Sequence, residues 1–239
     1  MTITLHQLPR AFGLPVSVSP FCTKLEAYFR LAGLDYRVVE VGPNKSPTGE
    51  VPFVTLPGGR VQADSADIIA EFEFDMPRLD KGMDDSLRAT AHELTTLAEG
   101  PVYFGCLYAR FVEDGGWQHQ KQVLRGLIPR IAAPVVMPLV RRAQRKRCAE
   151  NGIVDRGSYE TVLAAIADLS DALGDKPYLF GAEPRTVDCA VWAQLLHTAY
   201  TKADNPARLA VRENPRLMAY IDRVGERAGF QLSRLSAAA

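Results

Sequence analysis

The first third of the sequence alternates between strand-like and helical segments, and this order restricts the fold more than any other feature. Residues 2–8 have the period of two that is typical of a strand, and residues 36–41, 53–56 and 60–63 are predicted to be three further short strands. Two longer runs have helical spacing. One opens at Ser19-Pro20 and closes at Gly33, and the other is capped by Ser65 and ends at Pro77. The predicted order is strand, helix, strand, then strand, strand, helix.

Pro52 stands directly before the third predicted strand. In a small α/β domain with this order of elements, that is the place where thioredoxin-like domains carry a cis-proline. Only an X-Pro bond adopts the cis form at low cost, and trans is the commoner isomer overall. The order of the strands and helices around Pro52 outweighs the general preference for the trans isomer. We therefore expect residues 1–76 to form a thioredoxin-like domain with a cis Val51-Pro52 bond.

The remainder of the chain has helical rather than strand-like patterns. Residues 77–85 are polar and marked by Gly and Pro, which indicates an interdomain linker before an all-α domain over 86–239. Apolar side chains at helical spacing support this prediction: Leu87, Ala91, Leu94, Leu97, Tyr159, Val162, Leu163, Ile166, Leu169, Leu173, Leu217, Tyr220, Ile221 and Val224. The most apolar stretch, 127–140, is interrupted by Arg130 and three prolines and is too short for a transmembrane segment.

Charge and cysteine usage exclude several classes of function. Lys plus Arg and Asp plus Glu are equal at 28 each, which removes the global electrostatic argument for a nucleic-acid partner. The four cysteines are far apart in sequence, and the four histidines match no ligand spacing, so we predict no metal site. The N-terminus lacks a basic region followed by an apolar core. We therefore expect a soluble protein of a reducing compartment, the cytoplasm.

Three short motifs carry a specific resemblance. They are Ser19-Pro20-Phe21-Cys22, Glu50-Val51-Pro52-Phe53 and Asp64-Ser65. They resemble the three glutathione-facing motifs of the glutathione transferase superfamily, which implies glutathione as the co-substrate. By this resemblance Ser19 is the thiol-activating residue, and Val51, beside Pro52, exchanges backbone hydrogen bonds with the cysteinyl part of glutathione. Asp64-Ser65 receives the γ-glutamyl end, whose carboxylate suits the Ser65 hydroxyl and a helix N-terminus.

Ser19 and Cys22 both have a chemical and a structural interpretation. A hydroxyl and the N–H groups of a first helical turn stabilise a thiolate, although Ser19 before Pro20 is also a common N-cap. The two roles are compatible. Cys22, one turn further on, could serve as a redox thiol, but burial as a small apolar side chain is favoured. Ser17 is a weaker substitute for Ser19.

The downstream half narrows the resemblance to the metaxin-like or failed-axon-connections-like branch. The segments that carry it are Leu139 to Asn151, the Gly152-Ile153 step and Leu173 to Gly181. Two features depart from the pattern. Val154-Asp155-Arg156-Gly157 stands where that branch tends to have a Gly-Arg-His-like stretch. Asp188 matches the aspartate of a folding cap, but the Ser or Thr expected three residues earlier is Arg185, which leaves Thr186 as an imperfect replacement. Asp188 is expected to be structural.

Two further groups of residues are candidates for binding. By resemblance, Tyr103, Tyr108 and Trp117 lie where the superfamily places its electrophile pocket, although core or dimer-interface positions fit them equally. A basic cluster, defined as Arg141, Arg142, Arg145, Lys146 and Arg147, could bind an acidic partner or phosphate, or touch a membrane surface together with the preceding apolar run. Zero net charge and the lack of interleaved aromatic residues favour a solvated helix face instead.

The leading functional hypothesis is a detoxifying glutathione transferase that joins the glutathione thiol to a small apolar electrophile and forms a homodimer. A non-catalytic glutathione-binding or protein-interaction module of metaxin-like type is the first alternative. A thiol-disulfide or deglutathionylating enzyme that uses Cys22 is the second.

Overall fold

The computed structural model describes residues 2–10, 13–42, 45–47, 49, 51–76 and 78–232. Glu50 of the second motif and Pro77, the predicted end of the second helix, lie outside the described residues. The chain divides into two compact units. One comprises Met1–Ala91, Lys176–Ala193 and Tyr220–Ala239, and the other comprises His92–Asp175 and Gln194–Ala219.

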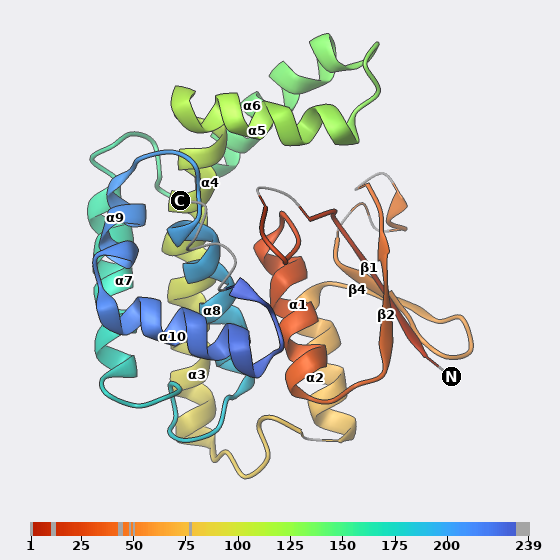
Figure 1. Cartoon of the computed structure of the whole chain (residues 1–239), viewed down its shortest axis with the longest axis vertical. Coiled ribbons are helices and arrows are strands. Elements are labelled where there is room, and N and C mark those ends of the chain that lie inside the picture. The colour runs from red at the N-terminus through yellow and green to blue at the C-terminus, as the bar shows by residue number, and fades with distance from the viewer. Residues whose placement is uncertain are drawn as a thin grey trace. The chain divides into compact units, whose positions relative to one another are not determined.

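The first unit contains a four-stranded mixed sheet. Its strands are β1 (Ile3–Gln7), β2 (Tyr36–Glu40), β3 (Phe53–Thr55) and β4 (Val61–Ala63), in the spatial order β2-β1-β3-β4. β1 pairs with β2 in parallel, and β3 pairs with β1 and β4 in antiparallel fashion. The parallel pair requires a crossover, which the helix between β1 and β2 supplies. This arrangement confirms the predicted thioredoxin-like fold (Figure 1).

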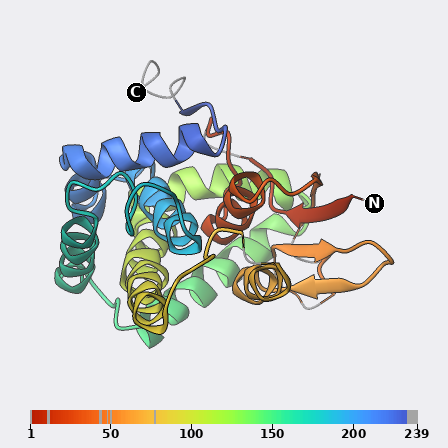
Figure 2. The same ribbon diagram turned by 90° about the horizontal axis from the view of Figure 1, so that it is seen from below.

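Helices α1 (Pro20–Leu31) and α2 (Ser65–Asp75) pack side by side against the sheet (Figures 1 and 2). The Phe29 ring of α1 meets the Phe72 ring of α2 edge-on, with 5.7 Å between centroids. The core beneath them consists of fully buried apolar side chains: Leu5, Leu25, Tyr28, Phe29, Val54 and Ile68. Burial of these large side chains is what fixes the two helices on the sheet.

The start of each helix follows from its capping residue. α1 begins after Ser19, whose side chain accepts a hydrogen bond from the Cys22 N–H, and Pro20 occupies the first turn. The prediction that Ser65 caps α2 is wrong by one residue. The cap is Asp64, whose carboxylate accepts hydrogen bonds from the N–H groups of Ala66 and Asp67, while Ser65 is the first helical residue.

The rest of the described chain is mostly helical, as predicted. Its helices are α3 (Asp85–Leu97), η2 (Ala98–Val102), α4 (Tyr103–Phe111), α5 (Asp114–Leu127), α6 (Ala133–Glu150), α7 (Tyr159–Leu173), α8 (Thr186–Ala199), α9 (Pro206–Arg212) and α10 (Pro215–Arg227). The π-helical turn η2 contains Pro101, which lacks an N–H and therefore interrupts the α-helical ladder between α3 and α4. Leu87, predicted on an apolar face, is 38% exposed.

Asp188 is a structural residue, as expected. Its buried carboxylate accepts hydrogen bonds from the N–H of Leu179 at 3.0 Å, the N–H of Arg185 at 2.8 Å and the Tyr220 hydroxyl at 2.9 Å. Asp80 supplies a further cap to α8. Its carboxylate accepts hydrogen bonds from the N–H of Thr186 at 3.0 Å and from its hydroxyl at 2.6 Å. The start of α8 therefore has its orphan N–H groups satisfied from two places in the sequence.

Within the described part of the chain, no helix is both long enough and apolar enough to span a bilayer.

Candidate glutathione site

The sheet register brings the three predicted motifs to one end of the sheet. Phe53 at the start of β3 pairs with His6 near the end of β1, and with Ala63 at the end of β4. Val51-Pro52 therefore precedes β3 at the same edge at which β4 passes into Asp64-Ser65. The loop after β1 also ends here, because Val18 N–H donates to Pro9 O at 2.9 Å. The N-termini of both α1 and α2, with their positive dipole ends, consequently lie at this edge.

Ser19 is held at the start of α1, where its side chain caps the helix. The Ser19 side chain is partly exposed, and its Oγ accepts from the Cys22 N–H at 3.4 Å. The Ser19 hydroxyl also interacts with the Cys22 thiol, which opposes the larger effect of burial on the pKa of that thiol. A hydroxyl can accept and donate at once, so the capping bond leaves Ser19 able to donate to a bound anion.

Ser17 and Cys22 are less suited to contact a ligand. Ser17 is buried, and its hydroxyl already donates to Leu8 O at 2.8 Å. Cys22 is completely buried, and burial raises the pKa of its thiol. The thiolate is the reactive form, so a raised pKa and zero exposure both lower the reactivity of Cys22.

The Val51-Pro52 peptide bond is cis, as predicted. Val51 is only partly exposed and Pro52 is buried. No hydrogen bond to the backbone N–H or C=O of Val51 is found among the described residues. This free backbone at the edge of β3 can pair with an extended peptide in the manner of an added strand.

Asp64 and Ser65 form the third part of the edge. Asp64 has a φ of 68°, in the left-handed region that non-glycine residues rarely adopt, and its carboxylate caps α2. Ser65 is 4% exposed, and its hydroxyl has no partner within the described chain. A hydroxyl next to the N–H groups of a helix start is suited to a carboxylate. The cap at Asp64 was missed because Ser and Asp are both good N-caps and stand next to each other.

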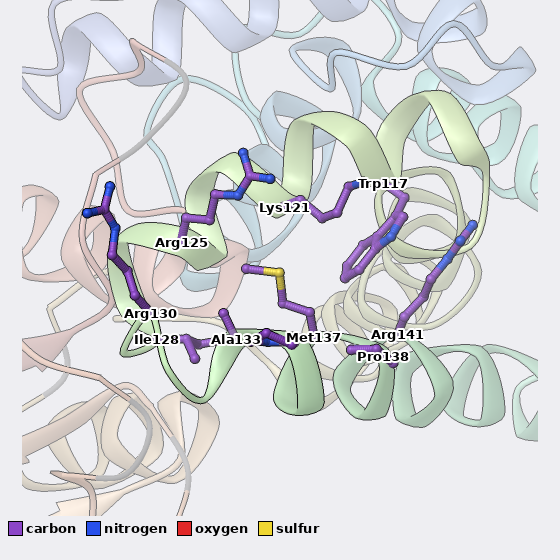
Figure 3. Close-up of a pocket in the computed structure, with 10 residues that line it drawn as sticks. Trp117, Lys121, Arg125, Ile128, Arg130, Ala133, Met137, Pro138 and Arg141 are labelled. Atoms are coloured by element: carbon purple, nitrogen blue, oxygen red, sulfur yellow. The ribbon is translucent and has the colours of Figure 1, made fainter.

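The three aromatic candidates for an electrophile pocket do not share one pocket. Trp117 is buried and lines an open pocket of about 730 Å³ between α5 and α6. Figure 3 shows Trp117 and Met137 extending into this space, with Arg125 and Arg130 at its other end. Tyr103 instead contacts Phe104 with 4.9 Å between ring centroids, and Tyr108 contacts Tyr159 at 6.1 Å. These two tyrosines pack against other aromatic rings, as core residues do.

The side chains of the basic cluster likewise do not form a single site, because Arg141 and Lys146 have different partners. Arg141 donates to the backbone oxygens of Phe111 and Val112 at 3.0 and 2.7 Å and pairs with Asp114 at 2.7 Å. It therefore ties α6 to the turn between α4 and α5. Lys146 pairs with Glu150 at 3.5 Å. The described residues contain no group of three His, Cys, Asp or Glu side chains that could hold a metal ion.

Comparisons with known proteins agree with this geometry. The sequence model of the glutathione S-transferase N-terminal domain matches residues 20–116, and that of the C-terminal domain matches residues 162–224. Together these models match more than half of the chain.

Two curated relatives and one solved structure illustrate the similarity. The isoprene-epoxide–glutathione S-transferase of a Rhodococcus species is 29% identical over 93% of this chain and 97% of its own length. Failed axon connections of Drosophila melanogaster is 28% identical over 94% of this chain, which spans 57% of that longer protein. A glutathione S-transferase of Methylobacterium radiotolerans, solved in complex with glutathione sulfonate, is 16% identical. It aligns over 95% of this chain and 92% of its own, with a TM-score of 0.60, and so has the same fold. The chain belongs to the glutathione transferase superfamily.

Proposed function

We propose that the protein is a glutathione transferase in which the Ser19 hydroxyl stabilises the thiolate of bound glutathione. The observation that carries this proposal is the place of Ser19, whose side chain is partly exposed and caps the N-terminus of α1 at the edge where the three motifs meet. A hydroxyl that donates to an anion stabilises the charged form and lowers the thiol pKa. The N-terminus of α1 acts in the same direction.

The rest of the edge supplies contacts for the tripeptide. The backbone of Val51 pairs with the cysteinyl residue, beside Pro52. The Ser65 hydroxyl and the start of α2 receive the γ-glutamyl carboxylate, and Asp64 accepts from the γ-glutamyl ammonium group. The glutathione sulfonate complex of a structural neighbour supports glutathione as the ligand of this fold.

The second substrate in this proposal is a small apolar electrophile. The Rhodococcus relative is named for an isoprene epoxide, and an epoxide is an electrophile of this class. The thiolate sulfur attacks a ring carbon, the carbon–sulfur bond forms and the carbon–oxygen bond breaks, and the alkoxide takes a proton from water. Detoxification, a cytoplasmic location and a homodimer belong to the same proposal, and a solution mass near the 26.3 kDa of one chain would contradict the dimer.

The test compares the wild type with Ser19→Ala and Ser19→Thr. Thiolate absorbance of bound glutathione, followed against pH, gives the thiol pKa, and turnover of an epoxide gives kcat/KM. Because a hydrogen bond to a charged group contributes about 1.5–3 kcal/mol, we expect Ser19→Ala to raise the bound thiol pKa by about 1–2 units and lower kcat/KM roughly 10- to 100-fold. Ser19→Thr keeps both the cap and the donor and should retain activity. An unchanged thiol pKa in Ser19→Ala would refute the proposed role of Ser19.

The same samples discriminate the two alternatives. A thiol-disulfide enzyme that uses Cys22 predicts disulfide exchange that Cys22→Ser abolishes, and the complete burial of Cys22 argues against it. A non-catalytic module predicts glutathione binding without turnover of any electrophile.

A further inference from the structure

Three large apolar side chains are exposed in a row along α6 and the turn before it. Ile131 is 97% exposed, Val135 66% and Leu139 59%. Ile131 is the most exposed large apolar residue in the described chain. Val135 and Leu139 are four residues apart on α6 and therefore share one helical face, and Ile131 lies in the turn directly before the helix. We call Ile131, Val135 and Leu139 the apolar row. A contiguous exposed row of this kind marks an interaction surface more often than scattered single residues do.

The surrounding segment is strongly basic and contains no acid. Between Asp114 and Glu150 the sequence has eight Lys or Arg residues and no Asp or Glu, although the whole chain has zero net charge. Arg125 lies in the last turn of α5, Arg130 in the turn next to Ile131, and Arg142 one turn beyond Leu139. None of these three arginines forms an ion pair with a carboxylate within the described chain, and all three are exposed.

Contacts on the opposite side of α6 explain why the apolar row faces outward. Met137 is 8% exposed and faces the pocket that α6 shares with α5, where Trp117 is also buried. Arg141 fixes this side by its bonds to Phe111 O and Val112 O. The inner face is therefore anchored by Arg141, so the apolar row cannot turn inward without breaking these bonds. Figure 3 shows Arg125 and Arg130 near the turn that joins the two helices.

From this arrangement we infer that the α5–α6 pair docks on an anionic phospholipid membrane. The apolar row enters the boundary between headgroups and acyl chains, and Arg125, Arg130 and Arg142 bind the lipid phosphates. An amphipathic helix with an apolar face and flanking Lys or Arg is the form that lies in a membrane interface. Each cation near an anionic surface strengthens binding. The protein binds on the membrane through this face and does not cross it.

A second copy of the chain is the main competing occupant, and charge argues against it. A two-fold dimer interface places the same patch on both subunits. Such an interface here would bring two acid-free basic segments together, and like charges across an interface are unfavourable. An anionic lipid surface has the complementary charge.

The test is co-sedimentation of the full-length protein with vesicles. Vesicles of phosphatidylcholine alone are compared with vesicles that also contain phosphatidylserine, at low and high salt. We expect binding to the anionic vesicles, weaker binding at high salt and little binding to neutral vesicles. The double variant Ile131→Ser/Val135→Ser should bind at least about tenfold more weakly. Arg125→Gln/Arg130→Gln should lose roughly 25-fold, about fivefold per charge.

Matched controls separate docking from general effects. Leu209→Ser changes an exposed apolar residue that is 45% exposed on α9, and Arg88→Gln removes an exposed cation on α3. Both should bind like the wild type. Thermal unfolding verifies that every variant is folded. Absence of binding to anionic vesicles, equal binding to neutral ones, or unchanged binding of both double variants would overturn the inference. So would a solution dimer that Ile131→Ser/Val135→Ser dissociates, because the occupant would then be a second copy.

Discussion

Replacement of Asp188 by asparagine tests how the buried carboxylate stabilises the first unit. Oδ1 of Asp188 accepts from the Leu179 N–H and the Tyr220 hydroxyl, and Oδ2 accepts from the Arg185 N–H. Asparagine has almost the same size but only one oxygen. Whichever way its amide is turned, the NH₂ group faces at least one N–H donor. At least one buried donor is therefore left unsatisfied.

The expected cost follows from that count. Loss of a hydrogen bond to a charged acceptor costs about 1.5–3 kcal/mol, and an unsatisfied buried donor adds to this loss. We expect Asp188→Asn to lower the free energy of unfolding by about 3 kcal/mol and the Tm by roughly 6–12 °C for a chain of this size. Urea and thermal unfolding followed by circular dichroism measure both quantities. The control Asp168→Asn removes an exposed acid on α7 and should cost less than about 0.5 kcal/mol. A loss for Asp188→Asn as small as for this control would refute the reasoning.

Three further predictions follow from caps and burial. Ser19→Ala should lower the free energy of unfolding in urea by about 1 kcal/mol through loss of the N-cap, whereas Ser19→Thr should not; equal stabilities would contradict the capping role. All four cysteines are free and buried, so a thiol reagent should label them only after unfolding, and fast labelling of native Cys22 would contradict the structure. Burial lowers the pKa of His197 from 6.5 to about 3, so this residue holds more protons in the unfolded state. The free energy of unfolding should therefore fall by up to about 1.4 kcal/mol per pH unit below pH ~6.5. His197→Gln should reduce this slope. An unchanged slope in the variant would contradict the prediction.

Local sequence patterns predicted the four strands and the helices α1 and α2 well. β1 lies in a run of alternating apolar and polar residues, and Ser19-Pro20 and Gly33 mark the two ends of α1. These signals involve residues a few positions apart, so they are readable without the fold. The cis bond at Pro52 came from the order of elements around it, which the sheet register confirms.

Long-range contacts and exposure could not be predicted in the same way. Asp80 caps α8 across 106 positions of sequence, and no local pattern links it to Thr186. Arg185 stands where a capping Ser or Thr was expected, and Asp80 in the 77–85 segment caps the helix in its place. Leu87 has helical spacing but is exposed, because spacing identifies a face and not what covers it. For the same reason, the exposure of the apolar row could not be predicted from the sequence.

The measurement that tests the proposed site most directly is calorimetric titration of reduced glutathione into the wild type and Ser65→Ala. Ser86→Ala, which changes an exposed serine on α3, is the matched control. We predict binding with a Kd in the micromolar to millimolar range, a Kd raised roughly tenfold in Ser65→Ala through the lost bond to the γ-glutamyl carboxylate, and no change in Ser86→Ala. Absence of binding to the wild type, or equal affinity of Ser65→Ala and the wild type, would contradict the placement of glutathione at this edge of the sheet.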